Sequence, residues 1–296
     1  MIPSSASSFK GEYRFTILRA DRSVKLETDW MPNLITNSGL DRIGSGNAGG
    51  VYCRIGTGNT APTNADVDLV SQSASTSSTV AFSRVNNGSP NYETACAKTY
   101  EFALGAVVGN MAEIGVGWAA TGGTLFSRAL IVDGGGSPTT ITVLSSEILQ
   151  VTYRLTIYPA LSDSTGTVVI SGISYGFTSR CSTAGTTLGI DPTTPILGSS
   201  IIPRAYSGSI GSITASPSGT SSSLTSNGFS SYTNGNYYCD YGISANIATG
   251  NVSGGIKSIG VSINGVFDTQ IEFSSAIPKD GTNAFSMNLR QYWSRH

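Results

Sequence analysis

Apolar and polar residues alternate in short runs along the whole chain, and glycine, proline, asparagine or aspartate separates one run from the next. Alternation with a period of two is typical of strands that bury one face. The pattern therefore predicts an all-β protein built from antiparallel sandwiches. The predicted strands lie at 12–18, 24–30, 51–55, 98–104, 113–119, 124–131, 140–144 and 148–158 in the first half, and at 166–173, 206–213, 237–243, 256–263, 269–273 and 284–293 in the second.

Some connecting segments also carry local signals. Residues 20–23 join the first two strand runs, and the side chains of Asp21 and Ser23 suit a tight turn, so a hairpin is expected there. Residues 183–200 and 214–236 are rich in Ser, Thr, Gly and Pro. We expect both of these longer segments to be loops.

One segment has a helical pattern. Residues 37–43 offer Asn37 or Ser38 as an N-terminal cap, and Gly44 can end the helix. The sequence therefore predicts one short helix near residues 37–44.

The two halves of the chain carry similar motifs in the same order. Each half closes with a long alternating strand that holds one arginine, Arg154 in the first half and Arg290 in the second. This echo indicates a tandem duplication; the alternative is that strands spaced by glycine look alike by composition. The other matching segments are 52–62 with 206–217 and 113–117 with 258–262.

The length of each half fits an ordinary domain. A half of this size can bury a sandwich core of its own. Pro159 follows the last strand of the first half and cannot donate a ladder hydrogen bond, so it is a natural exit point. We therefore expect two antiparallel β-sandwich domains, residues 1–159 and 160–296.

Charge and hydropathy exclude several classes of protein. The 296 residues include 17 basic and 18 acidic side chains, which gives a net charge of -1 without a basic block, so nucleic acid is not an expected partner. The longest apolar runs are far shorter than the roughly 20 residues of a membrane-spanning helix, and no membrane span is expected. The first ten residues lack the basic and apolar regions of a secretion signal, so we expect synthesis in a cytoplasm without secretion by a signal peptide.

The residues that usually carry catalysis are scarce. His296 is the one histidine, so a Ser-His-Asp triad or a histidine-based metal site is not expected. Cys53, Cys96, Cys181 and Cys239 lie tens of residues apart, which is not a zinc-binding spacing, and we expect buried free thiols. The sequence thus predicts no enzyme, no cofactor and no metal.

A few carboxylates still deserve comparison with known chemistry. Asp66 and Asp68 could act as paired carboxylates or, with Asn64, coordinate Ca²⁺ loosely, but the segment lacks the remaining EF-hand ligands. Asp133 precedes three glycines. We interpret all three aspartates as turn residues. Residues 56–60 resemble a phosphate-binding loop only in their glycines, and we expect a turn.

A tyrosine-rich segment is the best candidate for a binding surface. Residues 230–238 combine tyrosine with Asn, Ser and Gly, a mixture that suits protein or sugar surfaces. Tyr232, Tyr237, Tyr238 and Tyr241 are therefore candidate surface-binding residues. The alternative is a hairpin whose alternate tyrosines pack on the sandwich.

Several motifs resemble structural proteins of tailed bacteriophages. Residues 30–41 read Trp-Met-Pro-Asn-Leu-Ile-Thr-Asn-Ser-Gly-Leu-Asp, and residues 55–63 read Ile-Gly-Thr-Gly-Asn-Thr-Ala-Pro-Thr. The resemblance covers most of residues 10–160 and, more thinly, 160–296. Other segments similar to that group are 126–131, 153–158, 277–279 and 289–295.

The resemblance implies a structural component of the virion tail, such as a tail adaptor, tail-tip or fibre-attachment protein, made in the cytoplasm of the bacterial host. Its expected partners are other copies of itself, in a symmetric ring or trimer, and neighbouring tail proteins, so that it links tail machinery to fibres or to the tip. The alternative is a receptor-binding module that recognises a host-surface glycan or pilus through the tyrosine-rich loops. An enzyme that degrades a surface polysaccharide is a third, weaker reading.

Two apolar strand runs bear on assembly. Residues 151–158 and 168–173 would promote aggregation if they formed exposed sheet edges, and the chain offers few lysines to protect them. We therefore expect a second copy or another tail protein to cover them in a closed oligomer.

Overall fold

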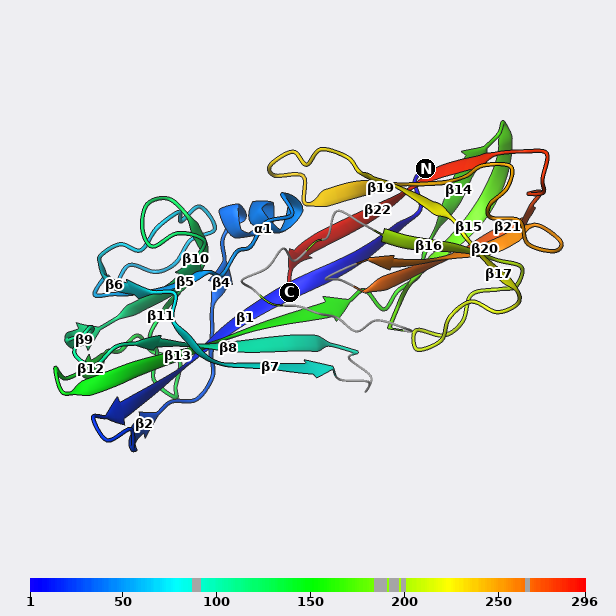
Figure 1. The fold of residues 1–296 in the computed structure, drawn as a ribbon. Helices are drawn as coiled ribbons and strands as arrows, with labels where there is room; N and C mark the ends of the chain where they lie inside the picture. Colours follow the sequence, from blue (N-terminus) through cyan, green and yellow to red (C-terminus); the bar gives the residue numbers. More distant parts are fainter. Residues whose placement is uncertain (87–91, 184–190, 192–196, 198–200, 264–266) are drawn as a thin grey trace.

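The computed structural model is an elongated molecule with two lobes, and nearly all of its regular structure is β-strand (Figure 1). It describes residues 1–86, 92–183, 191, 197, 201–263 and 267–296. The prediction of an all-β protein with antiparallel sheets is confirmed.

The described residues of the first half of the chain form α1 and thirteen strands. These are β1 (Ser4–Arg19), β2 (Val24–Glu27), β3 (Met31–Pro32), β4 (Leu34–Ile35), α1 (Asn37–Gly44), β5 (Tyr52–Gly56), β6 (Gln72–Thr76), β7 (Thr79–Asn86), β8 (Thr94–Phe102), β9 (Gly109–Met111), β10 (Glu113–Gly117), β11 (Leu125–Leu130), β12 (Ile141–Val143) and β13 (Glu147–Pro159). The second half holds β14 (Ser164–Ile170), β15 (Ile173–Ser182), β16 (Ile201–Tyr206), β17 (Ser221–Ser223), β18 (Thr225–Phe229), β19 (Tyr238–Ala245), β20 (Ile256–Ile263), β21 (Asp268–Ile277) and β22 (Phe285–Arg295).

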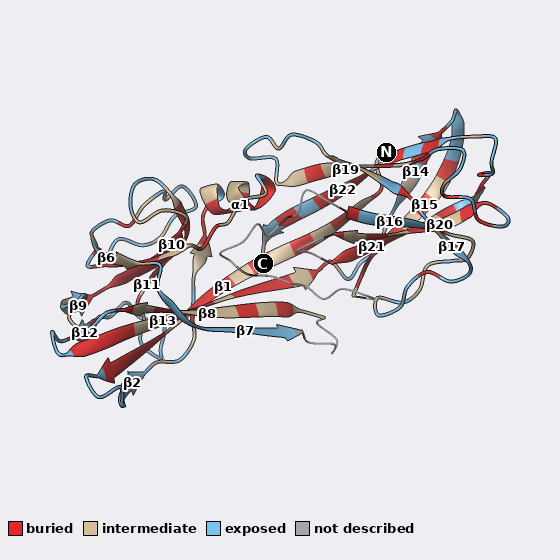
Figure 2. Cartoon of the chain, in the orientation of Figure 1, coloured by how far each residue is buried: buried red, intermediate tan, exposed pale blue. Residues whose placement is uncertain are grey.

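The described strands form three main sheets. The large sheet has the order β18-β19-β22-β1-β13-β8-β7, and β2 and β3 add to β1 beside this path. A five-stranded sheet, β4-β11-β10-β5-β6, belongs to the first lobe, and a six-stranded sheet, β14-β15-β21-β20-β16-β17, belongs to the second. A small sheet pairs β9 with β12. Figure 2 shows the buried residues alternating with exposed ones along many of these strands.

Strand β1 connects the two lobes. Its residues 7–19 pair antiparallel with β13, and its residues 4–9 pair in parallel with residues 290–295 of β22. The strand is this long because apolar residues such as Phe9, Tyr13 and Phe15 recur at alternate positions and are buried. A cut at Pro159 passes between β13 and β14 but leaves the large sheet shared by both halves.

The same set of strand pairings occurs twice along the chain. In chain order, β5, β6, β7, β8, β10, β11 and β13 correspond to β16, β17, β18, β19, β20, β21 and β22. Each antiparallel pair among the first set has its counterpart in the second. This repeated topology supports a tandem duplication more strongly than the short sequence matches do.

The strand registers show which residues correspond. Ile114 pairs with Ile55, and Ile259 pairs with Ala205, so the match of 113–117 with 258–262 agrees with the structure. The other proposed match is wrong by four positions. Gly56 lies opposite Glu113 and Tyr206 lies opposite Ser258, so Tyr206 corresponds to Gly56 and not to Tyr52.

The expected hairpin is present, because β1 and β2 pair antiparallel and Asp21 Oδ1 accepts the Ser23 N–H at 2.9 Å. The short helix is also present, over Asn37–Gly44. Its predicted cap is wrong. Thr36 caps α1 by accepting the Gly39 N–H at 2.9 Å, since its hydroxyl is also fixed by the Leu125 carbonyl of β11.

Several strand boundaries differ from the prediction. The run at 206–213 is not a strand, because β16 ends at Tyr206 and the backbone that follows bonds to side chains: Gly211 N–H donates to Gln270 at 2.8 Å. The predicted loop at 214–236 contains β17 and β18. Most of the other predicted loop, 183–200, lies outside the described residues. Strands β3, β4, β6, β7, β9, β15 and β16 were not predicted.

All four cysteines are buried and free, as expected. Burial raises the pKa of Cys53, Cys96 and Cys181, which leaves these thiols protonated and unreactive. In the part of the chain that the structure describes, no helix is long and apolar enough to cross a membrane.

Candidate functional site

A buried ion pair between Glu113 on β10 and Arg128 on β11 holds the loop of residues 57–71 against the first lobe. The two side chains are 0% and 1% exposed, and Arg128 Nε donates to Glu113 Oε2 at 2.9 Å. Arg128 also donates to Asp66 Oδ2 at 2.7 Å and to the Thr60 carbonyl at 2.8 Å. Glu113 accepts backbone N–H groups of Gly58, Val70 and Ser71. The pair therefore satisfies both buried charges and fixes the loop at several points.

A second arginine fixes the end of the same loop. Arg54 on β5 is fully buried, and its Nη1 donates to Asp68 Oδ1 at 2.7 Å. Its Nε donates to the Ala119 carbonyl at 2.9 Å. Asp68 Oδ2 in turn accepts the N–H groups of Gly122 and Gly123, at 3.0 and 3.2 Å. Asp68 thus connects two loops at one end of the lobe.

The second lobe has neutral side chains at the two positions that correspond to Glu113 and Arg128, while the charged Glu272 and Arg180 also hold its loop: Glu272 accepts the Ile210 N–H at 3.2 Å and Arg180 donates to the Gly211 carbonyl at 2.8 Å. Ser258 and Gln270 take the places of Glu113 and Arg128 in the strand register. Ser258 Oγ donates to the Gly208 carbonyl at 2.6 Å. Gln270 accepts the Gly211 N–H at 2.8 Å and donates to the Ser212 carbonyl at 3.0 Å. At these two positions, both repeats hold their loop, and the buried ion pair of the first lobe is replaced by neutral side chains in the second.

The structure shows the surroundings of Asp66, Asp68 and Asp133, the three aspartates that were considered as candidate site residues. Asp66 and Asp68 bind separate arginines, and neither faces the other as a carboxylate pair. Burial alone would raise the pKa of Asp66, but hydrogen bonds from Thr63 and Arg128 outweigh it and hold that pKa below its usual value. Asp133 Oδ1 accepts the N–H groups of Gly135 and Ser137, which is a turn arrangement.

Tyr232 connects the two halves of the chain. Its hydroxyl donates to Asp41 Oδ1 in α1 at 2.6 Å, and its ring centroid lies 5.4 Å from that of Trp293. The Gly235 N–H donates to the same Asp41 oxygen at 2.8 Å. Burial, followed by the Asp41 carboxylate, raises the pKa of Tyr232 well above its usual value. The tyrosine-rich segment therefore holds α1 against β22.

The other candidate tyrosines lie in different surroundings. Tyr241 is 1% exposed, which does not fit a surface role. Tyr237 packs against the core, and its carbonyl accepts the Trp293 N–H at 3.0 Å. Tyr238 lies under the Arg290 guanidinium at 3.8 Å and beside Tyr292 at 5.5 Å between centroids. The four tyrosines do not form one surface; Tyr238 with Tyr292, which is 40% exposed, is the accessible part.

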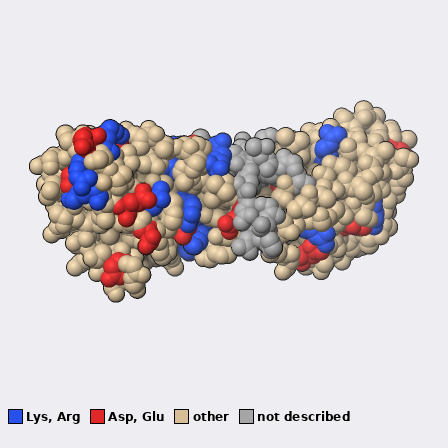
Figure 3. All heavy atoms as spheres, turned by 90° about the horizontal axis from the view of Figure 1, so that it is seen from below, with Lys and Arg blue, Asp and Glu red and all other residues tan. Residues whose placement is uncertain are grey.

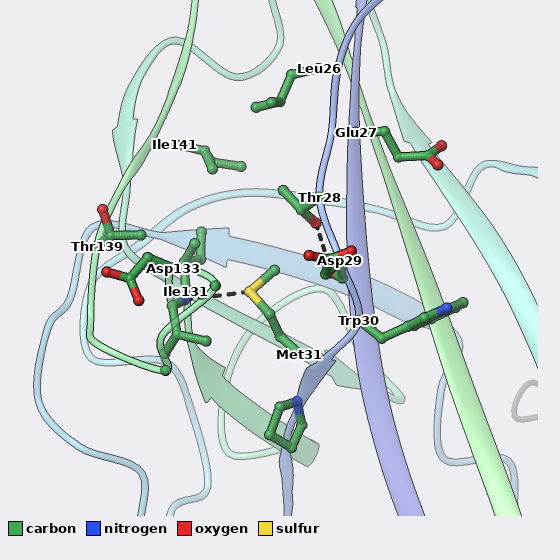
Figure 4. A pocket seen from close by; sticks show the side chains of 14 residues that line it. Leu26, Glu27, Thr28, Asp29, Trp30, Met31, Ile131, Asp133, Thr139 and Ile141 are labelled. Atoms are coloured by element: carbon green, nitrogen blue, oxygen red, sulfur yellow. Dashed lines mark hydrogen bonds between the residues drawn. The ribbon is translucent and has the colours of Figure 1, made fainter.

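An open hollow of about 490 Å³ lies between residues 26–32 and residues 131–141 (Figure 4). Its polar groups include Asp29 and Asp133, and Figure 4 shows the Trp30 side chain extending away from Asp133. The Trp30 ring is instead covered by the Arg154 and Arg14 guanidinium groups, at 4.1 and 5.1 Å. The hollow therefore lacks an open aromatic platform. Among the described residues, no cluster of histidine, cysteine and carboxylate side chains could hold a metal ion.

Charged side chains are unevenly distributed over the surface. On the face drawn in Figure 3, the two signs are interspersed and most of them lie over the first lobe. Interspersed charges of opposite sign suit contact with another protein surface better than with a polyanion.

Comparisons with known proteins do not indicate a function for this chain. No family model matches the chain, and neither curated proteins nor solved structures match it. A functional assignment therefore depends on the residues and their arrangement.

Proposed function

We propose that this protein is a structural component of a bacteriophage tail, in which copies assemble in a symmetric ring or trimer and link tail machinery to fibres or to the tip. One observation carries the proposal most: β1 pairs with the closing strand of each repeat, with β13 in one lobe and with β22 in the other. A continuous strand between two sandwiches resists bending at the junction, since bending would break hydrogen bonds in both lobes. Rigid spacing is what a connector requires.

The two lobes also suit a connector because they are related in topology but differ in surface charge. On the face drawn in Figure 3, most of the charged side chains lie over the first lobe. Two lobes of similar topology and different surface charge can dock on different neighbours.

The proposal is tested on phage particles. Particles purified from the host should contain the chain in a fixed copy number per tail, and gold-labelled antibody against it should mark one position on the tail. A chain that separates from particles during purification, or that labels no tail structure, would contradict the proposal.

A receptor-binding module remains the alternative, and one observation favours it. Tyr238, Tyr292 and Arg290 form a partly exposed aromatic and cationic group on β19 and β22, with Arg290 bound to Asp240 at 2.6 Å. Such a group can contact a glycan or a pilus surface. If it does, Tyr292→Ala should abolish adsorption to host cells while particles still assemble. Unchanged adsorption would count against this alternative.

A further inference from the structure

Strand β7 is an exposed edge of the large sheet (Figure 2). Within the described residues, β8 is its one sheet partner, and residues 79–85 are all exposed. Val80, Phe82 and Val85 are 46%, 40% and 61% exposed. The pairing with β8 is regular from Ala81 to Asn86. A regular, apolar edge strand presents unpaired backbone groups that favour pairing with another strand.

Three other edge strands of the described sheets, β18, β14 and β17, carry features that discourage such pairing. At the opposite end of the large sheet, β18 has a register shift between Ser226 and Phe229, with Gly228 at φ 79°. At the edge of the six-stranded sheet, the Met1 ammonium group donates to the Thr167 carbonyl of β14 at 2.8 Å. Strand β17 is only three residues long. The apolar strand β13 is not an edge, because it lies between β1 and β8.

We propose that β7 pairs antiparallel with β7 of a second copy of this chain about a two-fold axis, so that two large sheets become one. The inference rests on the self-assembly in the proposed function and favours the ring over the trimer, because a two-fold contact closes a dimer, which is then the unit from which the ring is built. A two-fold axis perpendicular to the sheet pairs the two strands antiparallel. Each residue before the centre of one strand then lies opposite the residue equally far after the centre of the other. The register that pairs all of residues 79–85 is centred on Phe82, so Phe82 faces Phe82 of the second copy.

This register suits the side chains that β7 presents. On each chain, the Arg84 guanidinium lies 4.8 Å from the Phe82 ring centroid, and Lys98 Nζ lies 5.9 Å from it. In the two-fold pair, Arg84 faces Val80 of the second copy, so the arginines do not oppose each other. The second Phe82 ring joins a group in which cations already contact an aromatic face. The strand is thus complementary to itself, which favours a second copy over a foreign strand.

Opposite charges at position 82 provide the test. Phe82→Lys and Phe82→Glu each place like charges opposite one another, so each variant alone should dimerise about tenfold or more weakly than the native chain. An equimolar mixture should recover a heterodimer. Sedimentation velocity measures the dimerisation of each variant and of the mixture. Ile202→Lys is the matched control, because Ile202 is 67% exposed but lies on β16, an inner strand of the second lobe.

A cysteine gives a second measurement that does not depend on charge. The four natural thiols are buried, so the cysteine of the Phe82→Cys variant would be its one accessible thiol. Mild oxidation should link Phe82→Cys, but not Ile202→Cys, into dimers, because side chains opposite each other on paired strands are close enough for a disulfide.

If Phe82→Lys and Phe82→Glu each dimerise as well as the native chain, the proposed β7 contact is wrong, although the chain still self-associates. A native chain that stays monomeric at every concentration would also overturn it. Membership of the tail is decided separately by antibody labelling of particles. Circular dichroism of each variant shows whether the fold is retained.

Discussion

Glu113 and Arg128 lie on the face of their sheet opposite to the core residues Ile114 and Ala129, and the loop of residues 57–71 buries them. Two such charges are tolerated because each finds several partners: the arginine contacts Glu113, Asp66 and the Thr60 carbonyl, and the glutamate accepts loop N–H groups. The energetic consequence is asymmetric. Loss of one partner leaves the other buried and unpaired, which costs far more than the pair contributes in net terms.

Arg128→Met should therefore destabilise the protein by about 3–5 kcal/mol, because it removes the charge that pairs with buried Glu113. Denaturant unfolding followed by circular dichroism measures the change. The control is Arg14→Met. Arg14 forms an exposed ion pair with Glu27 at 3.3 Å, so its loss should lower the free energy of unfolding by less than about 1 kcal/mol. Equal losses in both variants would refute the special role of the buried pair.

Acid should weaken the fold through carboxylates such as Asp66. Its folded pKa lies below its ordinary value of 3.8, so the stabilisation it gives is complete above that value and is lost as pH falls through the folded pKa. The free energy of unfolding should thus fall below about pH 4, and the Asp66→Asn variant should lose less of it over the same range. Identical pH profiles for the two proteins would exclude Asp66 as a contributor.

At the scale of elements, the repeat performs one task with two chemistries. The loops that follow β5 and β16 are held from corresponding positions on β10 and β11 and on β20 and β21, which carry charged side chains in the first lobe and neutral ones in the second. In the second lobe, Glu272 and Arg180 also contact the loop. Neutral hydrogen bonds avoid the desolvation of two charges. The second lobe therefore provides a natural replacement for the ion pair.

The double variant Glu113→Ser/Arg128→Gln introduces the residues of the second lobe into the first. It should be less destabilised than Arg128→Met alone, because no uncompensated charge stays buried. A double-mutant cycle with the two single replacements should give a favourable coupling energy of about 1–3 kcal/mol. Additive losses would mean that the two side chains act independently.

The sequence predicted long strands well and short exposed ones poorly. β13 and β22 alternate over many residues and bury one face, whereas β6 and β7 are exposed or half-buried along their length and show no apolar period. Asp66 and Asp68 were recognised, but their arginine partners were not. Those contacts depend on strand register and on loop closure, which no local spacing encodes. Glu113 and Arg128 alternate with core residues, as exposed side chains do, so the strand pattern gave no signal that a loop buries them.

At the scale of the whole molecule, β1 makes the two repeats dependent on one another. In the second lobe, Ser5 Oγ lies 2.6 Å from Thr269 Oγ1 and 2.5 Å from Gln291 Oε1, and all three groups are buried. In the first lobe, Tyr13 OH lies 2.8 Å from Ser127 Oγ, at the position corresponding to Thr269. One strand therefore completes the polar contacts of both sandwiches.

A fragment of residues 160–296 should fail to fold by itself, because residues 290–295 would lose their β1 partner and Gln291 would lose Ser5. The full chain should unfold in a single calorimetric transition, since the large sheet spans both lobes. A fragment with the near-ultraviolet spectrum and sharp melting of a folded domain would show that the halves are independent.

The path of β1 also sets an order of events in time. Residues 4–9 pair with residues 290–295, so residues 4–9 wait for a segment that is synthesised much later than they are. Contacts between residues so distant in sequence form slowly, because the intervening loop must close first. Until β22 is made, β1 has only β13 beside it in that part of the sheet, and the inner edge of the second lobe stays open. Until then, the unpaired part of β1 can pair with strands of other chains. Slow synthesis of the segment up to β22 would therefore prolong the time in which the nascent chain can aggregate.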